Sequence, residues 1–268
     1  MALLAVRNER HYIGRCLRHL EEQGVAACVI DNESTDGTLD IVNTFSKSVV
    51  INVVHHPYPG YYDWEGLLKV KQRLASDIPA HWFMHLDADE IPEAPRHGQR
   101  LRDAILEVDR NGYNAINFDE FVFVPSTDEE HWEGRDYVAG MNHYYFFEPR
   151  PLRMIRAWKC SGSAVDIASS GGHDANFTNR KMCPDSFVMR HYISLSRNYL
   201  IGKYGARNFA DQEIKKGWHY NRVGLELNHV HIPEPSRLNI YRDDGVWDKS
   251  KPWKEHYFAH DHLPQKAE

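Results

Sequence analysis

The sequence is poor in cysteine and has no long apolar run. Its 268 residues include four cysteines, and no two of them have the Cys-x-x-Cys spacing of zinc knuckles and redox motifs. Scattered cysteines of this kind are typical of reduced thiols in a cytoplasmic protein. The longest apolar run, at residues 49–54, is broken by Asn52 and is far shorter than the roughly 18 residues of a membrane helix. We therefore expect a protein that works in the cytoplasm or, through peripheral association, at the inner face of a membrane.

The sequence also lacks a basic excess and a phosphate-binding glycine loop. Lysine and arginine number 32 against 38 aspartates and glutamates, a formal net charge of −6 that argues against a nucleic-acid partner. No Gly-x-x-x-x-Gly-Lys-Ser/Thr motif is present, which excludes a P-loop enzyme. The apolar start at residues 1–6 is interrupted at once by Arg7 and further charges, so no secretory signal fits there.

The first half of the chain alternates between strand and helix patterns. Apolar runs at residues 3–6, 26–30, 49–54 and 82–86 are typical of buried strands. Between them, apolar residues recur at helical spacing, as at Ile13, Cys16, Leu17 and Leu20. This alternation predicts an α/β fold with a mixed, mostly parallel sheet flanked by helices. Ligands of such sheets bind at the carboxyl ends of the strands, where residues 7–9, 31–32 and 87–89 are polar.

The second half is less regular. We expect strands near residues 144–147 and 152–158, a helix over residues 196–216, and a polar tail from Pro233 that wraps the surface. The whole chain, residues 1–268, is predicted to form one domain. Residues 1–110 form its regular half, and residues 111–268 form its less regular half.

Asp87 and Asp89 follow the fourth predicted strand as an Asp-Ala-Asp motif. Two carboxylates two residues apart can share a hard divalent cation, and such a cation can bridge phosphate oxygens and stabilise a departing diphosphate. Carboxylate and phosphate oxygens favour Mn²⁺ or Mg²⁺ as the cofactor. The simpler alternative is an ordinary acidic loop at a strand end.

A second polar segment, residues 31–38, follows the second predicted strand. The carboxylate of Asp31 can accept hydrogen bonds from a base N–H or a ribose hydroxyl, so we assign it a ligand role. Residues 34–37, Ser-Thr-Asp-Gly, have a mainly local role as turn and helix-cap residues.

In order and spacing, the motifs at residues 5–9, 30–38 and 85–90 resemble those of family 2 glycosyltransferases of the GT-A fold. The resemblance is clear for residues 1 to about 110. It implies that residues 1–110 form a nucleotide-binding half and that residues 111–268 form an acceptor half with a C-terminal helical cover. It implies an inverting transfer of a sugar from a nucleotide-diphosphate donor. It also implies a base and ribose pocket lined by Val6, Arg7 and Glu9, with Asp31 on the base. It places Arg73 near the diphosphate, and Asp87 and Asp89 at the ribose and the metal. Where the commoner pattern has a second acid, this chain has Asn32, which can still hydrogen-bond to the nucleotide.

Enzymes of the GT-A fold often take a further metal ligand from the C-terminal half. Beyond residue 110, the segment from His191-Tyr192 through Ser194 and Ser196 to Lys203 is similar to a pattern in a related branch of the class. His191 is the first candidate for the metal ligand and His173 the second, because a neutral imidazole would complete an oxygen-rich site. A satisfied core histidine is the alternative for each. The remaining histidine pairs are expected on the surface: His229 and His231, and His260 and His262.

An inverting transfer needs a general base for the acceptor hydroxyl. Asp174 is the first choice because it follows two glycines that would let a substrate approach, and Glu120 at the end of a strand is the second. Asp119 and Asp166 are further candidates. The acceptor is expected to be a glycan, free or linked to lipid or protein, as in polysaccharide biosynthesis.

Two other functions remain open at this stage. A phosphotransferase of the haloacid dehalogenase type also has a strand followed by Asp-x-Asp, although there the motif comes early in the chain. A non-catalytic module of the same fold would bind nucleotide or sugar without turnover.

Overall fold

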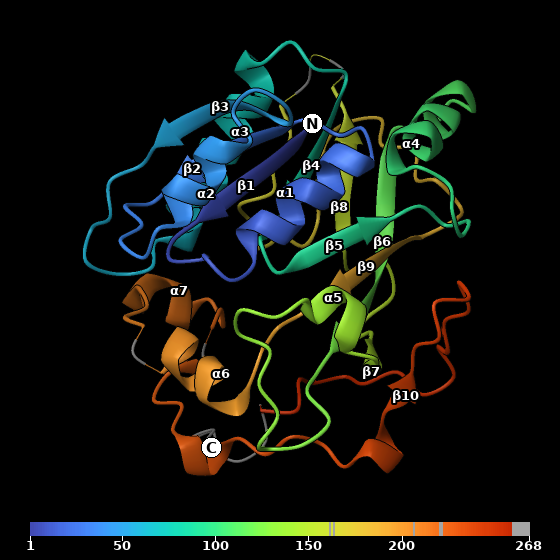
Figure 1. Ribbon diagram of the computed structural model, residues 1–268. Coiled ribbons are helices and arrows are strands. Elements are labelled where there is room, and N and C mark those ends of the chain that lie inside the picture. Colours follow the sequence, from blue (N-terminus) through green and yellow to red (C-terminus); the bar gives the residue numbers. More distant parts are fainter. Residues whose placement is uncertain (161, 163, 206, 220–221, 259–268) are drawn as a thin grey trace. The chain divides into compact units, whose positions relative to one another are not determined.

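The predicted alternation of strands and helices is present in the computed structural model, which describes residues 1–160, 162, 164–205, 207–219 and 222–258 (Figure 1). Seven elements lie before residue 87: β1 (Ala2–Val6), α1 (Ile13–Glu22), β2 (Ala27–Asp31), α2 (Thr38–Thr44), β3 (Val50–His55), α3 (Trp64–Asp77) and β4 (Trp82–Leu86). The later elements are β5 (Glu90–Glu93), α4 (Leu101–Arg110), β6 (Ala115–Phe123), α5 (Tyr137–Gly140), β7 (His143–Phe147), β8 (Ile155–Lys159), β9 (Phe187–His191), α6 (Arg197–Tyr204), α7 (Asp211–Lys215) and β10 (Asn239–Ile240).

The chain divides into two units. Unit 1 comprises Met1–Tyr58, Trp64–Asp119 and Leu152–Arg190, and unit 2 comprises Pro59–Asp63, Glu120–Pro151 and His191–Glu268. The prediction of one domain with halves at residues 1–110 and 111–268 stays a prediction. None of the helices in the described part of the chain has the length and apolar character needed to span a membrane.

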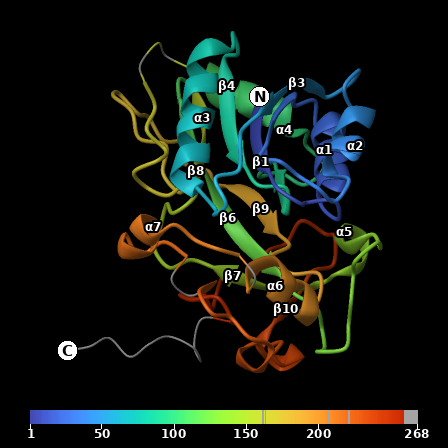
Figure 2. The same ribbon diagram turned by 90° about the vertical axis from the view of Figure 1, so that its left-hand side faces the viewer.

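Unit 1 contains the predicted α/β sheet. Strands β4, β1, β2 and β3 are parallel neighbours in that order, and β8 adds antiparallel to β4. Helices α1 and α2 lie on one face of these strands and α3 on the other (Figures 1 and 2). The register pairs Val6 with Asp31 and Leu4 with Leu86, so the three polar strand ends lie at one edge of the sheet. The predicted fold class, α/β with a mostly parallel sheet flanked by helices, is confirmed.

Two details of unit 1 differ from the prediction. The third strand is an edge strand rather than a buried one, with Ile51 53% and Val53 39% exposed. A short strand, β5, follows the Asp-Ala-Asp motif although it contains Pro92, and it pairs with β9.

Unit 2 is built on the antiparallel strands β6, β7 and β10. Its core contains Val122, Tyr145, Phe147, Ile193, Leu200 and Phe258. The predicted helix over residues 196–216 is two short helices, α6 and α7. The tail from Pro233 does not lie entirely on the surface, as the sequence had predicted, because its residues His256 and Phe258 are only 7% and 0% exposed. The aromatic ring of Trp253 stacks on that of Tyr145, with 4.4 Å between their centroids, and fastens the tail to β7.

Candidate functional site

Arg7 and Asn32 fasten the strand ends at the predicted nucleotide edge. Arg7 Nη1 donates to the carbonyl oxygens of Asn32 and Glu33, both at 2.6 Å, and its guanidinium lies 3.5 Å from the centroid of the Tyr58 ring. Asn32 Nδ2 donates to the carbonyl oxygens of His56 at 3.0 Å and Pro57 at 3.2 Å. The amide of Asn32 thus joins the ends of β2 and β3. Its predicted nucleotide contact stays a prediction.

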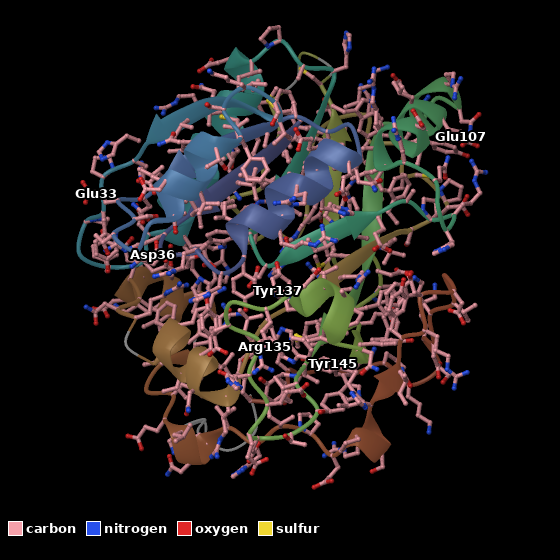
Figure 3. The ribbon with its side chains drawn as sticks, viewed as in Figure 1. Glu33, Asp36, Glu107, Arg135, Tyr137 and Tyr145 are labelled. Atoms are coloured by element: carbon pink, nitrogen blue, oxygen red, sulfur yellow. The ribbon has the colours of Figure 1, made fainter. Side chains whose placement is uncertain are left out.

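The segment after β2 has the local role that the sequence indicated. Asp36 accepts hydrogen bonds from the backbone N–H and hydroxyl of Thr38, at 3.0 and 2.6 Å, and from the backbone N–H of Arg10 at 3.1 Å (Figure 3). The hydroxyl of Thr38 in turn accepts from the backbone N–H of Glu9 at 2.8 Å. These bonds tie the chain after β1 to the start of α2. Asp31 is 2% exposed, and its carboxylate accepts from the backbone N–H of Ser34.

Asp87, the first carboxylate of the Asp-Ala-Asp motif, lies between two buried cations. Its Oδ1 is 3.7 Å from Lys71 Nζ, and its Oδ2 is 3.7 Å from Arg156 Nη1. The side chain of Asp87 is 30% exposed, whereas Asp89 is 5% exposed. Cations on two sides therefore restrain the position of both carboxylate oxygens of Asp87.

Lys71 is a functional candidate that the sequence analysis missed. It is 0% exposed, and its ammonium donates to the carbonyl oxygen of Leu86 at 3.0 Å and bonds to His85 Nδ1 at 2.7 Å. Burial lowers the pKa of Lys71 to about 8, with Asp87 acting in the opposite direction. A signal was present, because Lys71 lies between Leu67 and Leu74 on the apolar face of a helix, where a lysine needs a partner.

Arg73, the predicted diphosphate ligand, lies two residues farther along α3. Two helical residues differ by about 200° around the axis, so Arg73 faces away from Lys71 and is exposed. The predicted position of Arg73 beside the diphosphate stays a prediction. Among the cations of α3, it is Lys71 that approaches the Asp-Ala-Asp motif.

Glu90 and Arg156 form a buried ion pair beneath the motif. Both carboxylate oxygens of Glu90 lie 2.6 Å from Arg156 Nη1, and the two side chains are 1% and 5% exposed. Glu90 Oε2 also accepts the backbone N–H of Asp87 at 2.9 Å. The pair therefore holds the turn that carries Asp87 and Asp89 against β8.

His85 is buried beside the same turn. It is 0% exposed, and burial holds its pKa well below the usual value, so the ring is neutral. Its Nε2 faces Gly172, where an added Cβ would come within 2.6 Å of that nitrogen. The indole N–H of Trp64 donates to the carbonyl oxygen of Gly171 at 3.0 Å. These contacts hold the loop that leads to Asp174.

The two leading candidates for the general base have different surroundings. Asp174 belongs to unit 1, is 32% exposed at its side chain, and forms an ion pair with Arg180. Glu120 belongs to unit 2, is 3% exposed, and lies with its Oε1 2.7 Å from His191 Nδ1. Of the further candidates, Asp166 accepts the backbone N–H of Ser169 at 3.0 Å. The assignment of the base stays a prediction.

The predicted metal ligands belong to different units. Asp87 and Asp89 lie in unit 1 and His191 in unit 2, while His173 Nε2 lies 3.5 Å from Arg153 Nη2. Within the described ranges, no three or more histidines, cysteines, aspartates or glutamates form a group that could hold a metal ion. A cation such as Mg²⁺ is commonly held by one or two carboxylates plus substrate phosphates, so the oxygen donors of Asp87 and Asp89 fit one. His191 and His173 as ligands stay predictions, and His260 and His262 lie outside the described residues.

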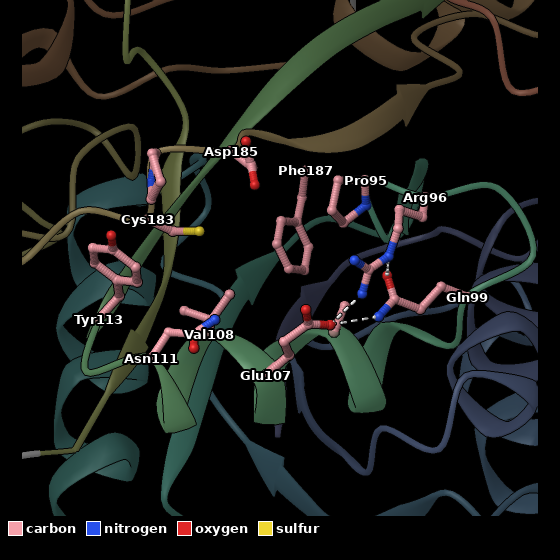
Figure 4. Close-up of a pocket in the computed structure, with 12 residues that line it drawn as sticks. Pro95, Arg96, Gln99, Glu107, Val108, Asn111, Tyr113, Cys183, Asp185 and Phe187 are labelled. Atoms are coloured by element: carbon pink, nitrogen blue, oxygen red, sulfur yellow. Dashed lines mark hydrogen bonds and ion pairs between the residues drawn. The ribbon is translucent and has the colours of Figure 1, made fainter.

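One pocket of unit 1 lies apart from all of these residues. It has a volume of 390 Å³ between α4 and the segment that leads into β9, and Glu107, Tyr113, Asp185 and Phe187 are among its lining residues (Figure 4). None of the predicted nucleotide, metal or base residues lines it. It is therefore a separate feature from the predicted donor site.

Comparison with known proteins identifies the sequence family. The model of the family "Glycosyl transferase family 2" matches residues 2–161, which confirms the resemblance of the motifs. No curated protein gave a significant match.

The chain also aligns in part with several solved structures. Residues 1–349 of S. aureus TarS in complex with UDP match with 14% identity and a TM-score of 0.46, over 79% of this chain and 67% of that one. A second S. aureus TarS structure matches with 13% identity and a TM-score of 0.45, over 79% of this chain and 40% of that one. A UDP-glucose pyrophosphorylase complexed with UDP-glucose matches with 8% identity and a TM-score of 0.28, over 49% and 60%.

Proposed function

The chain belongs to glycosyl transferase family 2 and is a nucleotide-sugar-dependent glycosyltransferase, and we propose that its transfer is metal-dependent and inverting. The observation that carries the proposal is the arrangement around Asp87 and Asp89 at the end of β4. Lys71, Arg156 and Glu90 hold Asp87 at the sheet edge where ligands of parallel sheets bind. Family membership also removes the reason to consider a phosphotransferase.

Asp87 and Asp89 would hold Mn²⁺ or Mg²⁺. A cation held there would supply Lewis-acid stabilisation of the charge that develops on the departing nucleoside diphosphate. Asp87 also accepts from a ribose hydroxyl in this proposal. Its restraint by Lys71 and Arg156 supports that role, because a carboxylate held from two sides loses little freedom on binding.

The nucleoside would lie beside the ends of β1 and β2. The register that pairs Val6 with Asp31 supports this position, since Val6, Arg7 and Glu9 of one strand end then lie beside Asp31 and Asn32 of the next. Asp31 would accept from the base. Arg73 is kept as a contact for the outer part of the diphosphate.

We assign the general base to Asp174. Its carboxylate is partly exposed, as a group that meets an acceptor hydroxyl must be, and it lies in the same unit as the Asp-Ala-Asp motif. Arg180 pairs with this carboxylate and restrains its orientation. Asp174 takes the proton of the hydroxyl, the oxygen attacks the anomeric carbon, and the diphosphate leaves from the opposite face, which inverts the configuration.

The acceptor is proposed to be a hydroxyl of a glycan, free or linked to lipid or protein, as in polysaccharide biosynthesis. The proposed location is the cytoplasm or the inner face of a membrane. The free state of Cys16, Cys28, Cys160 and Cys183 supports a reducing compartment.

Titration calorimetry with UDP, GDP, dTDP, CMP and ADP, each with and without Mn²⁺, tests the proposal. We expect one nucleoside diphosphate to bind with an affinity that rises with Mn²⁺, and Asp89→Asn to remove that rise. Asp77→Asn, an exposed carboxylate at the end of α3, is the matched control and should bind as the unaltered protein does. An affinity for the nucleoside diphosphate that is the same with and without Mn²⁺ would contradict metal dependence. Binding without turnover of the sugar nucleotide would indicate a non-catalytic module.

A further inference from the structure

The pocket between α4 and the segment that leads into β9 has no part in the proposed transfer (Figure 4). All of its lining residues belong to unit 1. Its volume of 390 Å³ lies within the range of about 300–1,000 Å³ that is usual for small-molecule sites. The pocket is therefore large enough to bind a small molecule of its own.

Contacts within unit 1 hold both sides of this pocket in place. On one side, the backbone N–H of Cys183 donates to a carbonyl oxygen of β6 at 2.8 Å, and the ring of Phe187 packs against that of Phe118 with 5.7 Å between the centroids. On the other side, Arg96 Nε donates to Gln99 Oε1 at 3.2 Å. A ligand would therefore meet walls that are already ordered, which lowers the entropy cost of binding.

The lining combines an apolar floor with a polar rim. Val108 and Phe187 are buried at the floor, and Figure 4 shows the Phe187 ring in the middle of the pocket, between Cys183 and Glu107. The side chains of the rim carry hydrogen-bonding groups: Arg96, Gln99, Glu107, Asn111, Tyr113 and Asp185. A molecule that fits here needs one apolar face and several polar groups at its edge.

Several groups of the rim are available to a ligand. Among the residues that the structure describes, the side chains of Asn111, Tyr113 and Asp185 make no hydrogen bond to the protein. Oε2 of Glu107 accepts from Gln99 Nε2 at 3.1 Å and pairs with an arginine, so the other carboxylate oxygen, Oε1, is left for a ligand. The rim thus offers two carboxylates as acceptors, and a phenol and an amide that can both donate and accept.

The charges of the rim favour a neutral ligand. Two carboxylates, Glu107 and Asp185, are present with one guanidinium, Arg96, which already pairs with Glu107. The net negative charge disfavours phosphates and carboxylates. A cation would meet only one uncompensated carboxylate, Asp185, and a wholly apolar molecule would leave the polar rim without partners. A neutral molecule with several hydroxyls satisfies both the floor and the rim.

We propose that this pocket binds one pyranose unit of a neutral glycan, at a site separate from that of sugar transfer. The C–H face of the sugar lies on the floor of Val108 and Phe187, and its hydroxyls bond to the rim. Asn111 and Asp185 are exposed, so the rest of the glycan can extend into solvent. The use of the site for a glycan rests on the acceptor class proposed above. A second contact of this kind keeps a glycan close to the enzyme and raises its effective concentration.

The experiment follows sugar binding at the pocket by NMR in the full chain. Valine methyl groups are labelled with carbon-13, and the signals of Val108 are assigned from their loss in Val108→Ile. The probes are the methyl glycosides of glucose, mannose and N-acetylglucosamine, and the oligosaccharides cellohexaose, maltohexaose, mannohexaose and chitohexaose. The variants Asn111→Ala, Tyr113→Phe and Asp185→Ala each remove one group of the rim. Asp77→Ala, an exposed carboxylate of α3 that does not line the pocket, is the matched control.

We expect at least one oligosaccharide to shift the Val108 signals saturably, and to bind more tightly than the methyl glycoside of the same sugar. Asn111→Ala and Tyr113→Phe should each weaken this binding by about 2–10-fold, the usual effect of losing one hydrogen bond. Asp185→Ala should weaken it by about tenfold or more because its carboxylate is charged. Asp77→Ala should bind as the unaltered protein does, and urea unfolding checks that every variant is folded.

The proposal is wrong if none of the probes shifts the Val108 signals, or if all three rim variants bind as tightly as the unaltered protein. A methyl glycoside that binds as tightly as its oligosaccharide would overturn the assignment to a glycan. Calorimetry with nucleoside diphosphates and Mn²⁺ on the same proteins keeps the two proposals apart. The rim variants should keep the donor affinity of the unaltered protein, and a lack of Mn²⁺-dependent binding in the unaltered protein would count against the proposed transfer alone.

Discussion

Removing Arg156 should destabilise the protein strongly because it takes away the cation that is hydrogen-bonded to the buried Glu90 carboxylate. The two side chains are 5% and 1% exposed, and their closest N···O distance is 2.6 Å. Breaking one partner of such a buried pair costs about 3–5 kcal/mol. For Arg156→Met, this corresponds to a fall of roughly 6–20 °C in melting temperature for a chain of this size.

The double variant Arg156→Met/Glu90→Gln separates the ion pair from simple loss of packing. It leaves no uncompensated charge at Glu90, so we expect it to be more stable than Arg156→Met alone by about 1–3 kcal/mol, a coupling energy usual for residues in contact. Urea unfolding followed by tryptophan fluorescence measures both. Arg96→Met is the control, because the Arg96 and Glu107 side chains are 65% and 41% exposed and such surface pairs contribute about 0–1 kcal/mol.

The prediction is wrong if Arg156→Met lowers the free energy of unfolding by less than about 1 kcal/mol. It is also wrong if the double variant is no more stable than Arg156→Met. Either result would mean that water or another group compensates Glu90. The same variants report on the donor site, because Glu90 accepts the backbone N–H of Asp87. The double variant should regain stability while its Mn²⁺-dependent binding of nucleoside diphosphate stays weakened.

Three further predictions concern single positions. Lys71→Met should weaken Mn²⁺-dependent diphosphate binding about tenfold or more in calorimetry, since loss of a hydrogen bond from a charged group costs about 1.5–3 kcal/mol. Asp31→Ala should weaken nucleotide binding more than Mn²⁺ binding, and equal weakening would contradict its role at the base. Burial lowers the pKa of His19 to about 4 from 6.5, and its Nε2 lies 2.7 Å from the Pro92 carbonyl oxygen. Below pH 6.5 only the unfolded chain takes up that proton, so stability should fall by up to about 3 kcal/mol as the pH drops from 6.5 to 4. Urea midpoints of His19→Gln should fall less over this range.

The gathering of polar strand ends at one edge of the sheet was predictable because its signals are local. Each parallel strand is a short apolar run, and the polar residues that follow Val6, Ile30 and Leu86 lie at one edge once the strands pair. The hydrophobic pattern alone therefore predicts that residues about 80 positions apart in the sequence lie at the same edge of the sheet. The alternation also gave α1, because its buried residues recur at helical spacing.

The residues that restrain the Asp-Ala-Asp motif could not be predicted from local sequence patterns. Arg156 lies on β8, which pairs with β4 antiparallel, and no local pattern specifies that two distant segments will pair. The tail shows a different limit. Its polar composition indicated a surface segment, but three residues, Trp253, His256 and Phe258, anchor it in unit 2. A few aromatic anchors bury a segment whose average composition is polar.

The charges around the Asp-Ala-Asp motif explain why a cation and a diphosphate should bind together. Asp87 is paired with the cations Lys71 and Arg156, and Glu90 is paired with Arg156. Asp89 is a third carboxylate of the same turn, so the cluster carries one net negative charge and alone repels a diphosphate. His85 adds no charge to the cluster because burial keeps its pKa low and its ring neutral. A divalent cation reverses the sign of the cluster and makes it attract the diphosphate, and the charge of the diphosphate in turn favours the cation. The structure therefore predicts that each ligand strengthens binding of the other by the same factor. The factor by which UDP raises the affinity for Mn²⁺ should equal the factor by which Mn²⁺ raises the affinity for UDP. A nucleoside monophosphate in place of UDP should give a smaller factor.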